Sequence, residues 1–359
     1  YAIILGHIIG GILLFGAGLI GGRLRQGSMN TTAFSFGPLG AKGFAFLNML
    51  QLIGWTSIMI YDAMLALQEL APLSPMIWTI AIGALVILWL FIGLHNTGYI
   101  QAIVSILLLG LTLYMGTHMI SQWPSEGGLL TSGNMSFIAA LELSIAMPLS
   151  WLPLISDYTR ESKHPLTASL TSATIYTVTS IVMYTLGLSA AIFGGGDSII
   201  TIMMNAGLGL AGLLVIIFST VTTTFMDAYS AGVSSTTIYN SASSKGIAVI
   251  VTIVGTIAAI LYPMDDITDF LYLIGSVFTP MIAILLADYF MNRQQVQTLS
   301  AFLVRGTIWA VSVGLYHYML HSESTVGATL PAFTMAFIIT TIIGFVSKTV
   351  KVSTEVKQP

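Results

Sequence analysis

The chain has 359 residues, of which 55% are apolar and only 7% charged, with a formal net charge of −3 and no cysteine. Soluble proteins carry about a quarter charged residues, so this composition predicts an all-α polytopic membrane protein. The absence of cysteine excludes disulfides and thiolate metal sites, and the unclustered basic residues predict no nucleic-acid partner.

Windows of about 20 apolar residues predict where the chain crosses the membrane. Because the chain starts at Tyr1 inside an apolar segment, we expect one further span upstream. The windows fall at about residues 1–20, 44–68, 76–94, 97–120, 135–156, 168–193, 206–231, 246–262, 270–290, 299–320 and 328–347.

The charges fix a predicted orientation. Strict alternation of these spans puts all 11 Lys and Arg residues on one side of the membrane, whereas the other side receives only acids such as Asp265 and Asp266. By the positive-inside rule the basic side is cytoplasmic. We therefore expect a multi-pass protein of the inner (plasma) membrane with a cytoplasmic C-terminus.

The first two spans carry different patterns. Glycines four residues apart in the first span, such as Gly6 and Gly10, predict close helix packing. In the second span Asn48, Gln51 and Trp55 fall near one face, followed by Met59 and then Asp62. An aromatic flanked by amides suits a flat polar ligand, although helix–helix hydrogen bonding with an interfacial Trp would explain the same residues.

The fifth span is predicted to be broken. It contains Glu142, then Pro148 and Pro153 with Trp151 between them. Proline removes a backbone donor and crowds the preceding turn. In a membrane, irregular backbone survives where it faces protein or a cavity, which is the usual architecture of a solute site in a transporter. A purely structural kink is the alternative.

The seventh span carries a polar stripe. Ser219, Thr223 and Asp227 repeat every four residues, with Thr220 and Thr224 beside them. Hydroxyls and a carboxylate on one face could bind sodium or a ligand, but Ser and Thr also bond back to their own helix.

Three acids are therefore predicted to be buried inside the membrane, namely Asp62, Glu142 and Asp227, and no Lys or Arg lies at a comparable depth. Such acids are functional candidates because an unpaired charge there is costly. This pattern favours a transporter over a merely structural bundle.

Several motifs suggest enzymes without completing a site. Asp265–Asp269 matches a magnesium-diphosphate pattern but lacks a second acidic motif. Tyr61–Asp62 and Gly194–Asp197 resemble the paired motifs of intramembrane aspartyl proteases, which need adjacent helices. His317 and His321 have metal-ligand spacing without a third ligand. An intramembrane enzyme and a non-transporting receptor remain alternatives to a transporter.

Two short motifs point to a family. Ile155–Arg160, I-S-D-Y-T-R, and Ala287–Phe290, A-D-Y-F, resemble the markers of the nucleobase–cation symporters (the cytosine/purine permease type). The longer runs Ser150–Arg160 and Thr223–Gly232 are most similar to the branch described as hydroxymethylpyrimidine transporters. The resemblance covers essentially the whole chain.

This resemblance implies a LeuT-like fold, with two inverted repeats of five spans plus two more and the family's first span missing. Residues 1–290 would form the transporter core, residues 291–347 the two additional C-terminal spans, and residues 348–359 a cytoplasmic tail. It also implies alternating access coupled to Na⁺ or H⁺. We further expect a monomer without an organic cofactor.

The resemblance also implies site residues. The family stacks its substrate between aromatics of its third and sixth spans; Trp55 matches the first position, and Pro148 the second, where Trp151 could substitute. Met59 stands at a family glutamine and Phe225 at a family asparagine, which argues for a different base. Combined with the polar residues noted above, the expected site residues are Gln51, Trp55, Met59, Glu142, Met147, Pro148, Trp151, Phe225 and Asp227 for substrate and Ile216, Ser219 and Thr220 for the cation.

The predicted function is import of a pyrimidine, with the thiamine precursor hydroxymethylpyrimidine as the first expectation. A carboxyl group can donate to a ring nitrogen and accept from the neighbouring exocyclic amine of an aminopyrimidine. We assign that role to Asp227 and Glu142. A cytosine, purine or allantoin permease is the alternative, and no enzyme activity is expected.

Overall fold

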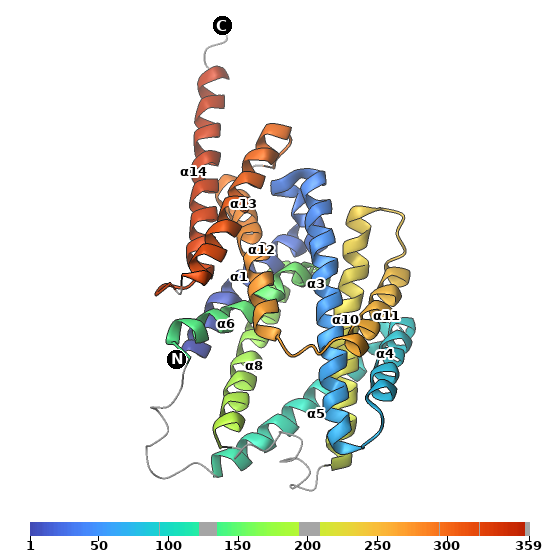
Figure 1. Ribbon diagram of the computed structural model, residues 1–359. Coiled ribbons are helices and arrows are strands. Elements are labelled where there is room, and N and C mark those ends of the chain that lie inside the picture. The colour runs from blue at the N-terminus through green and yellow to red at the C-terminus, as the bar shows by residue number, and fades with distance from the viewer. Residues whose placement is uncertain (93, 122–134, 194–208, 294, 323, 356–359) are drawn as a thin grey trace. The chain divides into compact units, whose positions relative to one another are not determined.

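The computed structural model describes residues 1–92, 94–121, 135–193, 209–293, 295–322 and 324–355, and these residues form helices and no strand. The predicted all-α class is therefore confirmed (Figure 1). In chain order the elements are α1 (Ala2–Leu24), α2 (Ser28–Thr31), α3 (Ala33–Leu70), α4 (Pro75–Ile92), α5 (Leu94–Ser121), α6 (Phe137–Ser150), α7 (Leu152–Thr159), α8 (Pro165–Phe193), α10 (Gly209–Ile238), α11 (Ser244–Leu261), α12 (Ile267–Leu286), the π-helix η2 (Ala287–Asn292), α13 (Leu299–His321) and α14 (Thr329–Glu355).

The predicted spans have their helices in the structure. Within the described residues, 10 segments are long and apolar enough to cross a membrane, and Gln101–Tyr114 of α5 forms a shorter apolar helix. The largest difference lies at α3, which starts at Ala33 rather than near residue 44. Gly37 interrupts it with φ 64°, and Pro38 follows. This left-handed conformation suits glycine, so α3 begins with a short kinked segment.

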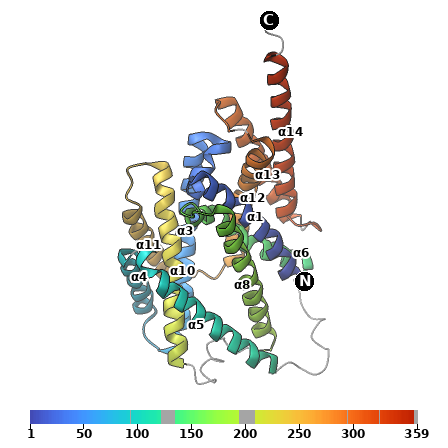
Figure 2. The same ribbon diagram turned by 180° about the vertical axis from the view of Figure 1, so that it is seen from behind.

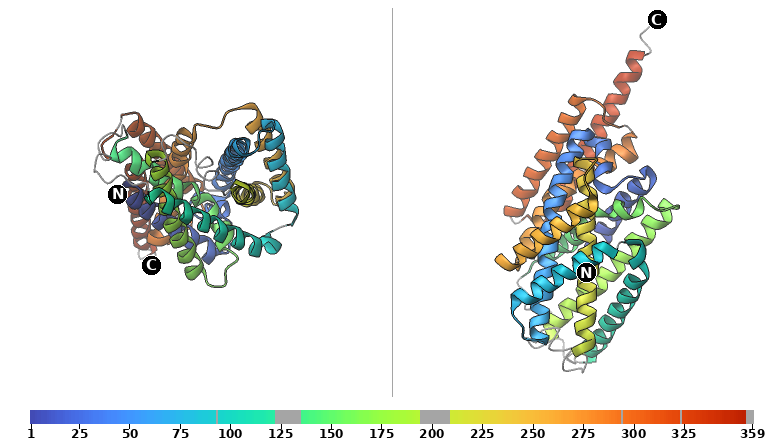
Figure 3. Two further views of the ribbon diagram at one scale, coloured as in Figure 1. Left: turned by 90° about the horizontal axis from the view of Figure 1, so that it is seen from below. Right: turned by 90° about the vertical axis from the view of Figure 1, so that its right-hand side faces the viewer.

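The helices divide into two compact units. Unit 1 comprises Tyr1–Leu47, Asn134–Thr179 and Thr268–Pro359, and unit 2 comprises Asn48–Gly133 and Ser180–Ile267. In unit 2, α4 and α11 lie side by side (Figures 2 and 3). Two apolar clusters form its core, one around Phe225 and Trp89 and one around Ile60 and Leu67.

Unit 1 is built on the close approach of α1 to α6. A Cβ atom at Gly6 would overlap Ser144, and one at Gly10 would overlap Pro148. The predicted packing role of these glycines is therefore confirmed. Leu14, Ile20 and Ile145 continue the contact as a buried apolar core.

The predicted break in the fifth span is also confirmed. α6 ends at Ser150 and α7 begins at Leu152, so Trp151 separates them with φ −92° and ψ −10°. Pro153 lies in the first turn of α7, where its missing N–H costs no helical hydrogen bond.

Both family-like motifs form contacts within unit 1. Asp157 accepts a hydrogen bond from the Ser28 backbone N–H at 2.8 Å, which fixes α2 on α7. Asp288 of η2 forms an ion pair with Arg305 of α13, with 3.0 Å between Oδ1 and Nη2. Asn292 donates to Asp288 and to the Thr340 carbonyl, so the end of η2 binds both α13 and α14.

Candidate functional site

A chain of two hydrogen bonds runs along the polar face of α3 in unit 2, and one of them joins α3 to α10. The Asn48 side-chain amide donates to the Ser234 hydroxyl at 2.8 Å, and the Gln51 amide donates to Asn48 Oδ1 at 2.7 Å. All three side chains are buried. The predicted polar face of the second span therefore contacts the seventh span.

The register of α3 against α10 places Trp55 near the level of Asp227. Asn48 pairs with Ser234, whereas Ile60 and its buried neighbours pack near Ile217, so the two helices run antiparallel (Figures 1 and 2). Trp55 follows Asn48 by seven residues, and Asp227 precedes Ser234 by seven residues. Because all α-helices rise by the same distance per residue, Trp55 and Asp227 lie at about the same height on the two antiparallel helices.

Two buried side chains with oxygen acceptors lie in this region. Gln51 Oε1 has no partner within the described residues. The Asp227 carboxylate is a second acceptor here, in a side chain only 5% exposed. Buried polar groups are normally satisfied, so this region is suited to a ligand that donates hydrogen bonds. Trp55 is buried at the same level.

Two other candidate substrate-binding residues of unit 2, Phe225 and Met59, differ in their burial. Phe225 is buried in an apolar core and stacks on Tyr229, with 6.1 Å between ring centroids. Met59 is only half-buried. Phe225 thus has a packing role that does not depend on any ligand.

The cation candidates form one turn of α10. Ser219 Oγ donates to the Ile216 carbonyl at 3.1 Å, and both residues and Thr220 are half-buried. The hydroxyls of Thr222 and Thr223 donate to the Ser219 carbonyl. Ser219 therefore does hydrogen-bond to its own helix, as the sequence allowed. Its hydroxyl oxygen still has lone pairs available to accept or to bind a cation.

In unit 1, the Glu142 carboxylate binds the start of α14. It accepts the Thr329 backbone N–H at 3.0 and 3.2 Å and the Thr329 hydroxyl at 2.5 Å. The carboxylate is favoured at a helix N-terminus, where backbone N–H groups are otherwise unsatisfied. No local sequence pattern indicates this partner, because Thr329 lies 187 positions away.

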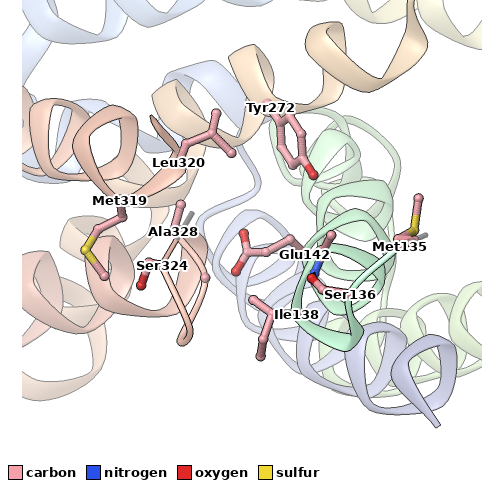
Figure 4. A pocket seen from close by; sticks show the side chains of 11 residues that line it. Met135, Ser136, Ile138, Glu142, Tyr272, Met319, Leu320, Ser324 and Ala328 are labelled. Atoms are coloured by element: carbon pink, nitrogen blue, oxygen red, sulfur yellow. The ribbon is translucent and has the colours of Figure 1, made fainter. Parts of the chain in front are cut away.

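Glu142 also lines a cavity of about 450 Å³ within unit 1. Figure 4 shows its carboxylate beside Ala328 and Ser324, with the Tyr272 hydroxyl facing the same space. The cavity mixes hydroxyl groups with apolar side chains from α6, α12, α13 and the turn before α14.

The remaining candidates surround the break between α6 and α7. Trp151 packs against Tyr176, with 5.7 Å between ring centroids, and the Tyr176 hydroxyl donates to the Met147 carbonyl at 3.2 Å. Pro148 is buried against Gly10. Trp151 is half-buried, so part of its ring surface is covered by α8.

Some sequence predictions do not match the structure or lie outside it. Asp62 is exposed, so the prediction that it is buried is wrong; the buried stripe of α3 runs through Ile60 and Leu67 instead. The described residues contain no group of three metal-binding side chains to complete His317 and His321. Gly194–Asp197 lies outside the described residues.

Comparison with known proteins identifies close structural counterparts. The structure of Mhp1, a nucleobase-cation-symport-1 family transporter, closed with bromovinylhydantoin bound, matches with a TM-score of 0.80 and 18% identity, covering 97% of this chain and 85% of Mhp1. A Na⁺-coupled sialic acid symporter, substrate-bound and outward-open, matches with a TM-score of 0.72 and 15% identity, covering 96% and 83%. The transporter fold expected from the sequence is therefore confirmed.

Sequence comparison agrees with the fold. The cytosine permease of Escherichia coli (strain K12) is 22% identical over 321 residues, covering 88% of this chain and 76% of the permease. The sequence pattern of a family described as "Permease for cytosine/purines, uracil, thiamine, allantoin" matches residues 1–358. This multi-pass membrane protein therefore belongs to the family of permeases for cytosine/purines, uracil, thiamine and allantoin.

Proposed function

We propose that this chain is a cation-coupled symporter that imports an aminopyrimidine, with hydroxymethylpyrimidine as the first candidate substrate. The proposal depends chiefly on two buried acceptors in unit 2, namely Gln51 Oε1, which has no hydrogen-bond partner among the described residues, and the Asp227 carboxylate. An exocyclic amine offers two N–H donors, so it can satisfy both acceptors, provided that both point to the same ligand.

Trp55 is the proposed stacking surface. Its indole is buried at the level of Asp227, and stacking of a heterocyclic ring on an aromatic side chain contributes roughly 1–3 kcal/mol. Phe225 is better explained as core packing, because its ring already stacks on Tyr229. We therefore assign the reading of the ring edge to Gln51 and Asp227 rather than to Phe225.

The proposed coupling ion is sodium, held in part by the turn at Ser219 and Thr220. Hard cations prefer oxygen ligands, and Ser219 uses its hydroxyl proton on the Ile216 carbonyl while keeping its lone pairs. The Na⁺-coupled sialic acid symporter shares the fold, which supports a cation without identifying it. A proton carried by a buried acid is the alternative.

Uptake by cells that express the full-length protein tests the proposal. We expect radiolabelled hydroxymethylpyrimidine to accumulate in a sodium-dependent way, and Asp227→Ala to abolish uptake. Glu69→Ala, which removes an exposed acid of the same unit, is the control and should transport normally. Uptake near wild type in Asp227→Ala would refute the assignment of that carboxylate.

Competition distinguishes the substrates within the family. Unlabelled cytosine, uracil, hypoxanthine and allantoin are added in turn to the uptake assay. If cytosine competes better than unlabelled hydroxymethylpyrimidine, the cytosine permease reading replaces the first candidate. Cytosine and hydroxymethylpyrimidine both contain an exocyclic amine, so hydrogen bonding to Gln51 and Asp227 does not by itself distinguish the two substrates.

A further inference from the structure

Unit 1 contains a second cavity, of about 540 Å³, which none of the proposed transport residues lines. It lies where η2 ends, against the first turns of α13 and against Ile343 and Ser347 of α14. Along α14 this is about 21 Å from Thr329 at 1.5 Å per residue. Its polar lining includes Arg293, Gln295, Gln297, Thr298, Arg305 and Ser347.

Arg293 makes this cavity electropositive, and Arg305 adds guanidinium donors. Arg305 is 6% exposed and its charge is balanced by Asp288, which accepts from Nε at 3.3 Å and Nη2 at 3.0 Å. Its third nitrogen, Nη1, makes no hydrogen bond in the described part of the chain. Arg293 is exposed and forms no ion pair with a described residue. No Asp or Glu is among the residues that line the cavity.

The arginines are also held in place. The backbone N–H of Arg293 donates to the Asp288 carbonyl, and Arg293 adopts a left-handed φ of 50°. Asp288 thus fixes Arg293 through its backbone and Arg305 through its side chain. The cavity therefore has one uncompensated positive charge and further guanidinium donors, which suit a singly charged phosphodiester.

Apolar surface adjoins the cavity. Val304 and Ile343 line it, and nearby Leu299 and Phe345 are 70% and 72% exposed. In a membrane protein, exposed apolar helix surface contacts acyl chains. A phosphate bound at the arginines would therefore have hydrocarbon beside it, as the phosphate of a phospholipid does.

We propose that this cavity binds the phosphate group of an anionic phospholipid, with its acyl chains along α13 and α14. Basic pockets between membrane helices on the cytoplasmic side bind such headgroups, and the cavity lies at the end of the helices that the charge distribution predicts to be cytoplasmic. The site is separate from the proposed transport residues and does not depend on the substrate.

The test is binding of phosphatidylglycerol to the purified full-length protein, measured by native mass spectrometry and by thermal unfolding in detergent. We expect phosphatidylglycerol to bind and stabilise the wild type, whereas phosphatidylcholine does not. Arg293→Gln should lower the affinity for phosphatidylglycerol roughly fivefold, because a basic side chain at a lipid surface contributes about 1 kcal/mol.

Arg25→Gln is the matched control. Arg25 is also an exposed arginine with a left-handed φ, 54°, at a helix end, but it does not line the cavity. Ser347→Glu adds a carboxylate to the cavity and should also weaken binding, whereas Ser347→Ala should not. Equal phosphatidylglycerol affinity in Arg293→Gln and Arg25→Gln would overturn the proposal.

Inorganic phosphate distinguishes the source of the phosphate group. Free phosphate should neither stabilise the wild type nor displace the lipid, because it gains nothing from the apolar surface. If free phosphate stabilises the wild type as strongly as phosphatidylglycerol does, and Arg293→Gln removes both effects, then the cavity binds a soluble anion and the lipid assignment is overturned.

Discussion

Replacing Thr329 by valine removes one hydrogen bond between α14 and α6 while keeping the shape of the side chain. The Thr329 hydroxyl donates to Glu142 Oε2 at 2.5 Å, and both residues are buried. Hydrogen bonds to charged groups contribute about 1.5–3 kcal/mol. The two contacts from the Thr329 backbone N–H remain in the variant, so we expect a loss of about 2 kcal/mol in unfolding free energy.

Unfolding of the purified protein in mixed micelles measures this loss. Thr341→Val is the control on the same helix, because the Thr341 hydroxyl donates only to the Phe337 carbonyl one turn back. Thr329→Ser keeps the hydroxyl and should be close to the wild type. If Thr329→Val is as stable as Thr341→Val, then the Glu142 contact does not stabilise the fold and our reasoning about it is refuted.

Three further predictions concern other positions. Gly327→Ala should lower the unfolding midpoint, because Gly327 has φ 76° and a Cβ there would overlap the carboxylate bound to α14, whereas Gly306→Ala, with open space around it, should not. Asp288→Ala should destabilise the protein by about 3–5 kcal/mol in the same assay, since it leaves Arg305 buried without its partner. Trp55→Ala should raise KM for uptake roughly thirtyfold if stacking contributes ~2 kcal/mol; an unchanged KM would exclude stacking there.

The helices and the break between α6 and α7 were predictable from local sequence. A membrane span needs a continuous apolar run, and hydropathy detects such runs. The break at Trp151 followed from two prolines, whose effect on a helix is local. By contrast, the exposure of Asp62 depends on which face of α3 packs, and composition alone does not determine that face.

Contacts between distant positions were beyond such reasoning. The sequence identified Glu142 as an acid in a membrane span, but it could not identify Thr329 as its partner, because no local pattern joins the two positions. The same holds for Asn48 and Ser234, whose polar side chains were visible in the sequence while their pairing was not. The roles of Gln51, Trp55 and Asp227 in substrate binding stay predictions.

The contacts of α1 with α6 and α7 have a mechanical consequence for transport. On one side of the break, Gly10 of α1 packs directly on Pro148. On the other side, the hydroxyls of Ser156 and Thr159 donate to the α1 carbonyls of Ala17 and Gly18 at 3.0 and 2.8 Å. α1 therefore acts as a splint across the discontinuity. Because α1 contacts both sides of the break, α6 and α7 should not bend relative to each other there. We expect α1, α6 and α7 to move as one rigid body when the transporter changes conformation.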